Sequence, residues 1–534
     1  MINKRFPNKL CYGLFLSVAL SSNSHAGGFL DALNIINDVV ETTETVQTKT
    51  RTNSRVVKTT VAKFTEPTVE KVGYSKEFSE IKNLIKRDNF TQAYQIQEGR
   101  VREESPPDFL NSNEAGLLAL DVHKPSNAID HFAAAEHYLK INAADSVVEG
   151  AATTFSSEGL GMLMGLGEIS DYNGAPFERI LMLNYKSIAY LLNGERKAYN
   201  VTRRAIDWQN IEQKEFEKTL EIAKQKMAEE SGNSSAAETA GAVTSTASAT
   251  LNLLIPGVAN LFQEIQKPYK KSKKTAQSVS SAYVNPFGFY VAGIVQEFDS
   301  FEDKSLRNNA RISYKKALKL NPKSKVIKQA VKEVKRGPRR GKRLVQVVIA
   351  DGFAPEKRSL HFRIPTPGGI IPVKLPIYEP VKSKVAYVRI KSGKRTLATA
   401  SVVADIEAIT LRHQLDSMPF QHFKVMASIT RSSVESIGLS RLGGLGMVLK
   451  EVRESFANPD MRSWMSLPKQ LLAARFYVSK KLKSVTIVSY DKKWRRLATK
   501  KVLLPKNEHS FIYARTIDNI LTTNVNKTLW VKAK

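Results

Sequence analysis

Residues 335–349 read KRGPRRGKRLVQVVI, and the chain changes character inside this stretch. Apolar residues at helical spacing precede it, and Gly337-Pro338 interrupts any helix. Leu344–Ile349 then follows as a run rich in β-branched residues, which predicts a buried strand. We therefore expect an α+β protein, with helices before this boundary and a β-rich domain after it.

Four stretches before the boundary have the pattern of helical hairpins or of a closing helix. They are residues 81–96, 115–135, 177–208 and 310–322. The clearest is 177–208, where Asn193-Gly194 supplies the turn because glycine adopts positive φ without steric cost. Ala310–Pro322 is close to the closing helix of a tetratricopeptide repeat. The pattern predicts a tetratricopeptide-like helical domain over 76–335, with a loop-rich insert over 229–280; the alternative is a generic helical bundle.

Residues 344–534 are expected to form the β-rich domain. Predicted strands are 344–349, 361–364, 371–375, 385–390, 396–402, 473–478, 484–490, 511–514 and 528–531. Short strands separated by Gly and Pro turns fit a small β-sandwich or an open barrel. Residues 405–457 return to helical spacing, so the β-sandwich-like domain is expected to carry a helical insert there.

The first 26 residues have the order of a secretory signal peptide. Met1–Lys9 is basic, Leu10–Leu20 is apolar, and Ser24 and Ala26 are small residues at the −3 and −1 positions of a cleavage site. The apolar run is about half of the roughly 20 residues that span a bilayer. Cys11 follows Leu10 rather than a small residue, so we do not expect a lipid anchor. We expect an exported protein, in the periplasm or at the outer membrane, with 27–75 as an extended or mobile lead-in.

The formal net charge of +30 favours anionic partners. Candidate contacts to an anionic surface lie in two basic runs: Lys267, Lys270, Lys271, Lys273, Lys274, Arg336, Arg339, Arg340, Lys342 and Arg343. For an exported protein the anions would be acidic lipid, lipopolysaccharide or peptidoglycan carboxylates; the alternative for each run is a solvated linker. Nucleic acid is disfavoured, because few aromatic residues interleave with these charges.

The sequence offers no catalytic, metal or cofactor pattern. It lacks the His-Glu-x-x-His spacing of zinc proteases, the G-x-S-x-G serine elbow and a phosphate-binding P-loop. His413, with Asp405 and Asp416 nearby, is a weak metal hint, for which a surface or cap role is the favoured reading. We expect no catalytic residues, no metal and no cofactor.

A set of short motifs points to a family. Its positions are Asp171, Gly174, Glu178, Asn285, Pro286, Asp351, Gly352, Pro355, Lys357, Arg462, Trp464 and Pro468. With their neighbours they resemble an uncharacterised family of bacterial cell-envelope proteins, often lipoproteins, some of them encoded beside lipoproteins that activate penicillin-binding proteins. The resemblance implies a tetratricopeptide-like domain followed by a β-rich one, and it implies no catalytic residue. This sequence departs from the family by lacking the lipidated Cys.

Turn and packing chemistry is the alternative reading of the motif positions. Trp464 is expected to be buried in the β-rich domain; the alternative is an exposed recognition edge formed with Arg462. The overall expectation is a non-catalytic envelope interaction or scaffold protein that binds a protein or peptide partner through its helical domain. The alternative is an enzyme or accessory subunit that acts on peptidoglycan or another envelope polymer.

Cleavage after Ala26 should leave a mature chain that begins at Gly27. Because the −1 position needs a small side chain, Ala26→Gln should leave the precursor uncleaved, whereas Asn23→Gln should be processed normally. N-terminal sequencing of the protein from the envelope fraction of its host measures this. An uncleaved wild-type chain among the cytosolic proteins would contradict the prediction.

Overall fold

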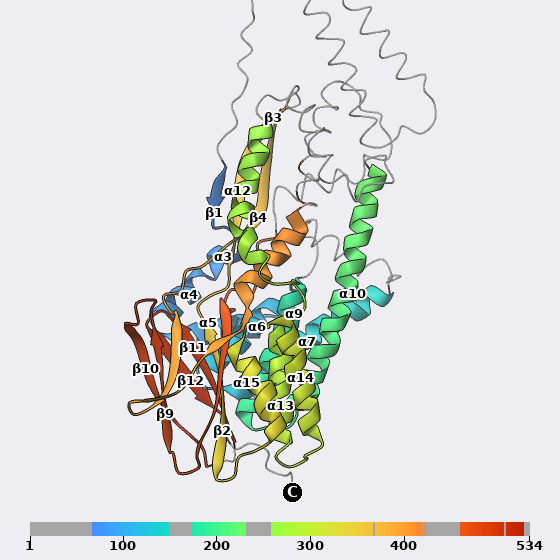
Figure 1. Ribbon diagram of the computed structural model, residues 1–534. Coiled ribbons are helices and arrows are strands. Elements are labelled where there is room, and N and C mark those ends of the chain that lie inside the picture. The colour runs from blue at the N-terminus through green and yellow to red at the C-terminus, as the bar shows by residue number, and fades with distance from the viewer. Residues whose placement is uncertain are drawn as a thin grey trace, which may run out of the picture.

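Helices dominate the chain up to residue 336 in the computed structural model, which describes residues 67–148, 172–230, 258–366, 369–418, 421, 425, 460–506 and 509–527 (Figure 1). The helices are α3 (Tyr74–Glu77), α4 (Ser79–Lys86), α5 (Phe90–Glu103), α6 (Phe109–Asp121), α7 (Pro125–Val148), α9 (Pro176–Asn193), α10 (Ala198–Glu230), α12 (Val258–Ala276), α13 (Pro286–Asp299), α14 (Leu306–Leu320) and α15 (Lys325–Arg336).

The helix ends follow local chemistry. The side chains of Asn89 and Asp108 accept hydrogen bonds from the backbone N–H groups of Gln92 and Asn111, and so cap α5 and α6. The turn expected at Asn193-Gly194 is present, with Gly194 at φ 82° at the C-terminal end of α9. Helix α12 is a departure from expectation, because it lies within the stretch that was expected to be rich in loops.

Strands follow from residue 342 onward, with one short strand earlier. They are β1 (Thr68–Glu70), β2 (Lys342–Asp351), β3 (Glu356–Thr366), β4 (Gly369–Glu379), β5 (Tyr387–Ser392), β6 (Arg395–Thr399), β7 (Ser401–Asp405), β8 (Gln470–Ser479), β9 (Ser484–Tyr490), β10 (Arg496–Leu503), β11 (His509–Ile517) and β12 (Ile520–Val525). They form three sheets with the orders β1-β3-β4, β10-β9-β5-β6 and β12-β11-β2-β8-β7. The pairing is antiparallel except between β11 and β2. The protein is therefore α+β.

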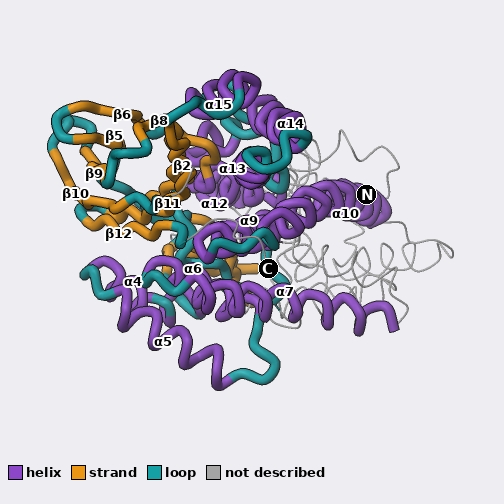
Figure 2. Tube along the Cα trace, turned by 90° about the horizontal axis from the view of Figure 1, so that it is seen from below, coloured by secondary structure: helices purple, strands orange, loops and turns teal. Residues whose placement is uncertain are grey.

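The five-stranded sheet lies between two apolar clusters because β2 is buried on both faces. Val345, Val347 and Ile349 join a cluster with residues of β5, β9 and β10, so the four-stranded sheet covers this side. Leu344 and Val348 belong to the other cluster, which contains most of the buried helical residues. Successive side chains of a strand point to opposite faces, so a single strand contributes to both clusters. Figure 2 shows β2 and β11 between the outer strands and the helices α9 and α13.

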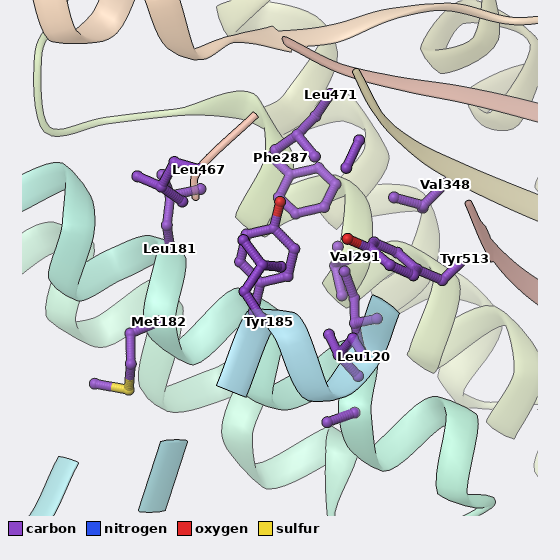
Figure 3. Packing of buried hydrophobic residues seen from close by; sticks show 14 of the residues in the cluster. Leu120, Leu181, Met182, Tyr185, Phe287, Val291, Val348, Leu467, Leu471 and Tyr513 are labelled. Atoms are coloured by element: carbon purple, nitrogen blue, oxygen red, sulfur yellow. The ribbon is translucent and has the colours of Figure 1, made fainter. Parts of the chain in front are cut away.

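Aromatic side chains form the contact between the helices and this central sheet. The ring of Tyr185 on α9 lies 6.5 Å from that of Tyr513 on β11 and 5.8 Å from that of Trp464, both in edge-to-face geometry. Figure 3 shows the rings of Tyr185, Phe287 of α13 and Tyr513 near one another, with Val348 of β2 close to Tyr513. The helical stretch and the β-rich stretch thus share one apolar core.

Most expected strands lie within observed ones, but β1, β10 and β12 were not expected. The expected strand at 396–402 is split at Ala400 into β6 and β7, and Ala400 donates its backbone N–H to Val388. The helical insert begins as predicted, with a helix over 406–418. The expected strand at 528–531 lies outside the described residues, as do most of 419–459 and all of 231–257.

A buried ion pair also joins the helices to the central sheet. Arg475 on β8 donates from both terminal nitrogens to the carboxylate of Glu297 on α13, at 2.7 and 2.9 Å. Tyr314 and Gln346 donate to the same carboxylate, and Arg475 also donates to Glu333 of α15. Such a pair is tolerated in the interior because its remaining hydrogen-bonding capacity is satisfied.

Arg475→Met should lower the free energy of unfolding by about 3–5 kcal/mol, because it leaves Glu297 buried without its cation. The double variant Arg475→Met/Glu297→Met should lose less than this single variant, since it leaves no buried charge unpaired. Arg102→Met, which removes an exposed partner of Glu98, should cost less than about 1 kcal/mol. Chemical denaturation measures all three, and equal losses for Arg475→Met and Arg102→Met would contradict the assignment.

Candidate functional site

The motif at 460–468 is a loop that precedes β8 and lies between the helices and the central sheet. Trp464 is 2% exposed, and its indole packs on the rings of Phe132 and Tyr185. The structure thus places Trp464 in the core and not at a recognition edge. The indole N–H donates to the hydroxyl of Ser466, so the buried ring leaves no unpaired donor.

Two glutamates from different helices bind three successive backbone N–H groups of this loop. Glu178 of α9 accepts from the N–H of Trp464 at 2.9 Å. Glu114 of α6 accepts from Met465 at 2.5 Å and from Ser466 at 3.1 Å. The loop backbone is buried and has no strand partner here, so these carboxylates supply acceptors that the interior would otherwise lack. We call this arrangement the glutamate clamp.

Burial sets the protonation behaviour of the clamp. It raises the pKa of Glu114 to about 8, against the opposing effect of the hydrogen bonds from Ser466 and Met465. The pKa of Glu178 is also raised by burial, although the N–H of Trp464 and the hydroxyl of Tyr172 favour its ionised form. Both oxygens of each glutamate accept hydrogen bonds, so the carboxylates serve as acceptors for the protein's own backbone.

The motif around Asp351 lies next to the same loop. Asp351 ends β2 and accepts from Thr516 and Gln470 at 2.8 and 3.0 Å. Gly352 has φ 65° and bonds through its N–H to the carbonyl of Thr516. The buried guanidinium of Arg515 donates to the carbonyls of Gly352 and Ser466, at 2.8 and 2.9 Å. Arg515 therefore ties the two motifs together.

Lys357 and Arg462 complete the contacts around the loop. The ammonium of Lys357 donates to the carbonyl of Arg462 at 2.7 Å. Arg462 pairs with Asp460 at 3.0 Å, and its guanidinium lies 5.1 Å from the ring centroid of Tyr172. At the edge of the loop, Lys357 thus donates to a backbone carbonyl, and Arg462 neutralises the carboxylate of Asp460.

The structure brings most of the family-motif positions together and leaves two apart. Those at or beside the glutamate clamp are Gly174, Glu178, Asp351, Gly352, Pro355, Lys357, Arg462, Trp464 and Pro468. Asn285 and Pro286 instead begin α13, where Asn285 caps the helix. Asp171 lies outside the described residues. Glu114, which the sequence reasoning missed, sits on an apolar helix with no motif around it, so no local pattern marks its role.

His413 and its acidic neighbours do not converge on a metal site. His413 is buried against the ring of Phe177, and burial lowers its pKa to about 4. Asp405 accepts from the N–H of Ala408 at the start of the 406–418 helix, and Asp416 pairs with Arg412. Across the described ranges, no group of three or more His, Cys, Asp or Glu side chains is placed to hold a metal ion.

The two predicted basic runs lie on different parts of the molecule. Lys270, Lys271, Lys273 and Lys274 are exposed on α12, beside β3 and β4 at one end of Figure 1. The run at 335–343 follows α15, which lies below α12 in Figure 1, so the two runs belong to separate elements. Arg343 is buried and donates to the carbonyl of Lys480, which removes it from the candidate surface contacts.

A larger basic surface covers α14, α15 and the turn between them. Residues 304–343 contain a single acid, Glu333, and that carboxylate accepts from Arg475 and Arg339. Exposed lysines on this surface are Lys315, Lys316, Lys319, Lys323, Lys325, Lys328, Lys332 and Lys335. Val326, Ile327, Ala330 and Val334 point inward, which holds the lysines of α15 outward. We call these eight lysines the basic helical face.

No protein family, curated protein or solved structure matches the chain. Among the helices of the described residues, none has the length and apolar character needed to cross a membrane.

Stability should depend on pH through Glu114. Its folded pKa of about 8 lies above the ordinary value, so folding takes up a proton that the unfolded chain does not bind at pH 7. The contribution of protonated Glu114 to the free energy of unfolding is present at low pH and is lost as the pH rises through 8. Glu114→Gln should remove a slope of roughly 1 kcal/mol per pH unit between pH 7 and 8, measured by chemical denaturation.

The difference in pH slope between the wild type and Glu114→Gln reports on the carboxyl of Glu114. Burial lowers the pKa values of His413, His509 and Lys82, which changes stability with pH in the opposite direction, but these groups are present in both proteins. Glu114→Gln should also be less stable at all pH values, since its amide presents a donor to a backbone N–H. Glu103→Gln, an exposed change on α5, should keep the wild-type slope. An unchanged slope in Glu114→Gln would show that the carboxyl does not titrate in this range.

Proposed function

We propose that the chain is an exported, non-catalytic interaction protein of the bacterial cell envelope, which holds an acidic protein partner on its basic helical face. The observation that carries the proposal is this face, eight exposed lysines on two packed helices and the turn between them, in a stretch with a single, already paired acid. A surface of one charge sign attracts and orients an oppositely charged partner.

The arrangement of α15 supports a defined docking surface. Lys325, Lys328, Lys332 and Lys335 recur at spacings of three and four residues, so they lie along one side of the helix. Among the described residues, none of the eight lysines of the face forms an ion pair with a carboxylate of the chain itself. Their charges are therefore available to a partner.

The use of the buried polar groups supports a non-catalytic role. Glu114 and Glu178 accept from the loop backbone, Asp351 accepts from Thr516 and Gln470, and Glu297 is paired with Arg475. An acid or base in catalysis must reach the proton that it transfers on a substrate. These carboxylates instead face other groups of the protein.

The finer architecture belongs to the same proposal. The pairs α4–α5, α6–α7, α9–α10 and α13–α14 would stack in the manner of tetratricopeptide repeats, in which each hairpin buries a face against the next. The four- and five-stranded sheets, which share an apolar cluster, would be the β-sandwich-like element. Both features are what the resemblance to the envelope family implies.

In-cell cross-linking followed by mass spectrometry tests the proposal. Replacing Lys325, Lys328, Lys332 and Lys335 together with Gln should abolish capture of the partner, since it removes four positive charges from the face. The matched control replaces Lys270, Lys271, Lys273 and Lys274 with Gln, and should leave capture intact. Both variants carry a photo-reactive residue in place of Gln329, so that the cross-linking reaction does not require lysine side chains.

Two outcomes would contradict the proposal. Equal capture by the two quadruple variants would reject the basic helical face as the docking surface. Release of new muropeptides from purified peptidoglycan sacculi by the full chain would favour the alternative of an enzyme acting on an envelope polymer. An unchanged muropeptide profile is the expected result.

A further inference from the structure

The four-stranded sheet carries basic residues and no acids. Residues 387–399, which contain β5 and β6, include no Asp or Glu. Residues 484–503, which contain β9 and β10, include only Asp491. That carboxylate is already engaged, because it accepts from the guanidinium of Arg495 and from two backbone N–H groups of its own turn. Ten Lys and Arg residues occupy the same two stretches.

Because successive side chains of a strand point to opposite faces, some of these basic residues can be placed on the outer face of the sheet. Val388 and Ile390 point into the cluster that the sheet shares with β2, so Arg389 and Lys391 point outward. Lys391 is opposite Thr486, which is opposite Lys501, and Arg389 is opposite Val488. Within the described ranges, no helix or sheet belongs to a shared apolar cluster on this outer side.

A stack of planar groups stands at one corner of the outer face. The ring of Trp494 lies parallel to that of Tyr387, with centroids 4.0 Å apart and 1° between the planes. The guanidinium carbon of Arg389 also lies 4.0 Å from the Trp494 centroid. Tyr387 and Arg389 are two residues apart on one strand, hence roughly 6–7 Å apart on the same face. The indole therefore lies between them.

The stack holds a cation in a fixed plane at the surface. Arg389 has no ion pair or hydrogen-bond acceptor in the part of the chain that the structure describes, and its Nε is buried without a partner. A planar guanidinium with free N–H groups is suited to bidentate binding of phosphate. Tyr387 and Trp494 remain 37% and 44% exposed. Because both faces of the indole are covered, the aromatic surface left for the apolar face of a ring is the second face of Tyr387 and the edge of Trp494.

We propose that the outer face of the β10-β9-β5-β6 sheet binds a phosphate-bearing saccharide, of the kind that the head group of bacterial lipopolysaccharide presents. Arg389 binds the phosphate, Tyr387 and Trp494 contact the sugar ring, and Lys391 and Lys501 attract neighbouring phosphates. The inference rests on the proposed envelope location, and it adds a second surface, distinct from the basic helical face.

The placement of the aromatic rings favours a saccharide over single-stranded nucleic acid. A strand-binding surface needs aromatic side chains placed along the path of the strand, so that successive bases can stack. Here Tyr387, Tyr490 and Trp494 gather in one place, and Tyr387 and Arg389 cover the two faces of the indole. One ring contact with several phosphate contacts fits a phosphorylated sugar.

Binding of the full chain to purified lipopolysaccharide that retains only the phosphorylated inner sugars tests this inference. The dephosphorylated form of the same lipopolysaccharide is the matched ligand. Arg389→Gln should weaken binding to the phosphorylated form by about tenfold or more, because it removes a charge-assisted bidentate contact. Trp494→Gly should weaken it as well, and glycine suits the φ of 62° at this position, so the turn is kept.

Lys328→Gln on the basic helical face is the control and should bind the saccharide as wild type does. Circular dichroism and thermal melting establish that each variant is folded. Wild-type affinity in Arg389→Gln, equal affinity for the dephosphorylated ligand, or tighter binding of a single-stranded oligonucleotide would each overturn the inference. Because partner capture depends on α15, such a result leaves the proposed function standing. Equal capture by the two quadruple variants would reject the basic helical face and leave this inference standing.

Discussion

The glutamate clamp is the interaction on which the assembly of this protein depends. The loop at 460–468 must cross the interior between the helices and the central sheet, and its N–H groups at Trp464, Met465 and Ser466 have no strand to pair with. A buried donor without an acceptor costs about 1–3 kcal/mol, so three of them would prevent this loop path. Glu114 and Glu178 provide the acceptors, and the path of the loop fixes where β8 begins.

The same principle recurs wherever helices meet sheets. Arg475 pairs with Glu297 across the contact of α13 with β8, and Lys82 of α4 pairs with Glu356 at the start of β3. Each pair joins residues far apart in the chain, and each is enclosed by the apolar core. Each pair is neutral, so the excess of Lys and Arg over Asp and Glu in the chain remains at the surface, where it appears on α14, α15 and the four-stranded sheet.

Whether a strand could be predicted from the sequence depended on how many of its residues are buried. Strands β2, β8 and β11 are buried on both faces, so their apolar runs are continuous and were recognised. Strand β10 reads RLATKKVL and lies at a sheet edge with little buried except Val502, so its sequence resembles a loop. Strand β12, ILTTNV, is also an edge strand, and because of its polar residues its sequence resembles a loop as well.

The sequence by itself determined the α+β class, the helical turn at Asn193-Gly194, and the burial expected for Trp464, because spacing, capping and turn chemistry are local. Only the tertiary structure decided that Glu114 would bind Met465 and Ser466, and that Tyr387 and Arg389 would enclose Trp494. These contacts join residues more than one hundred positions apart. Their geometry arises from the packing of whole elements, which leaves no trace in the spacing of neighbouring residues.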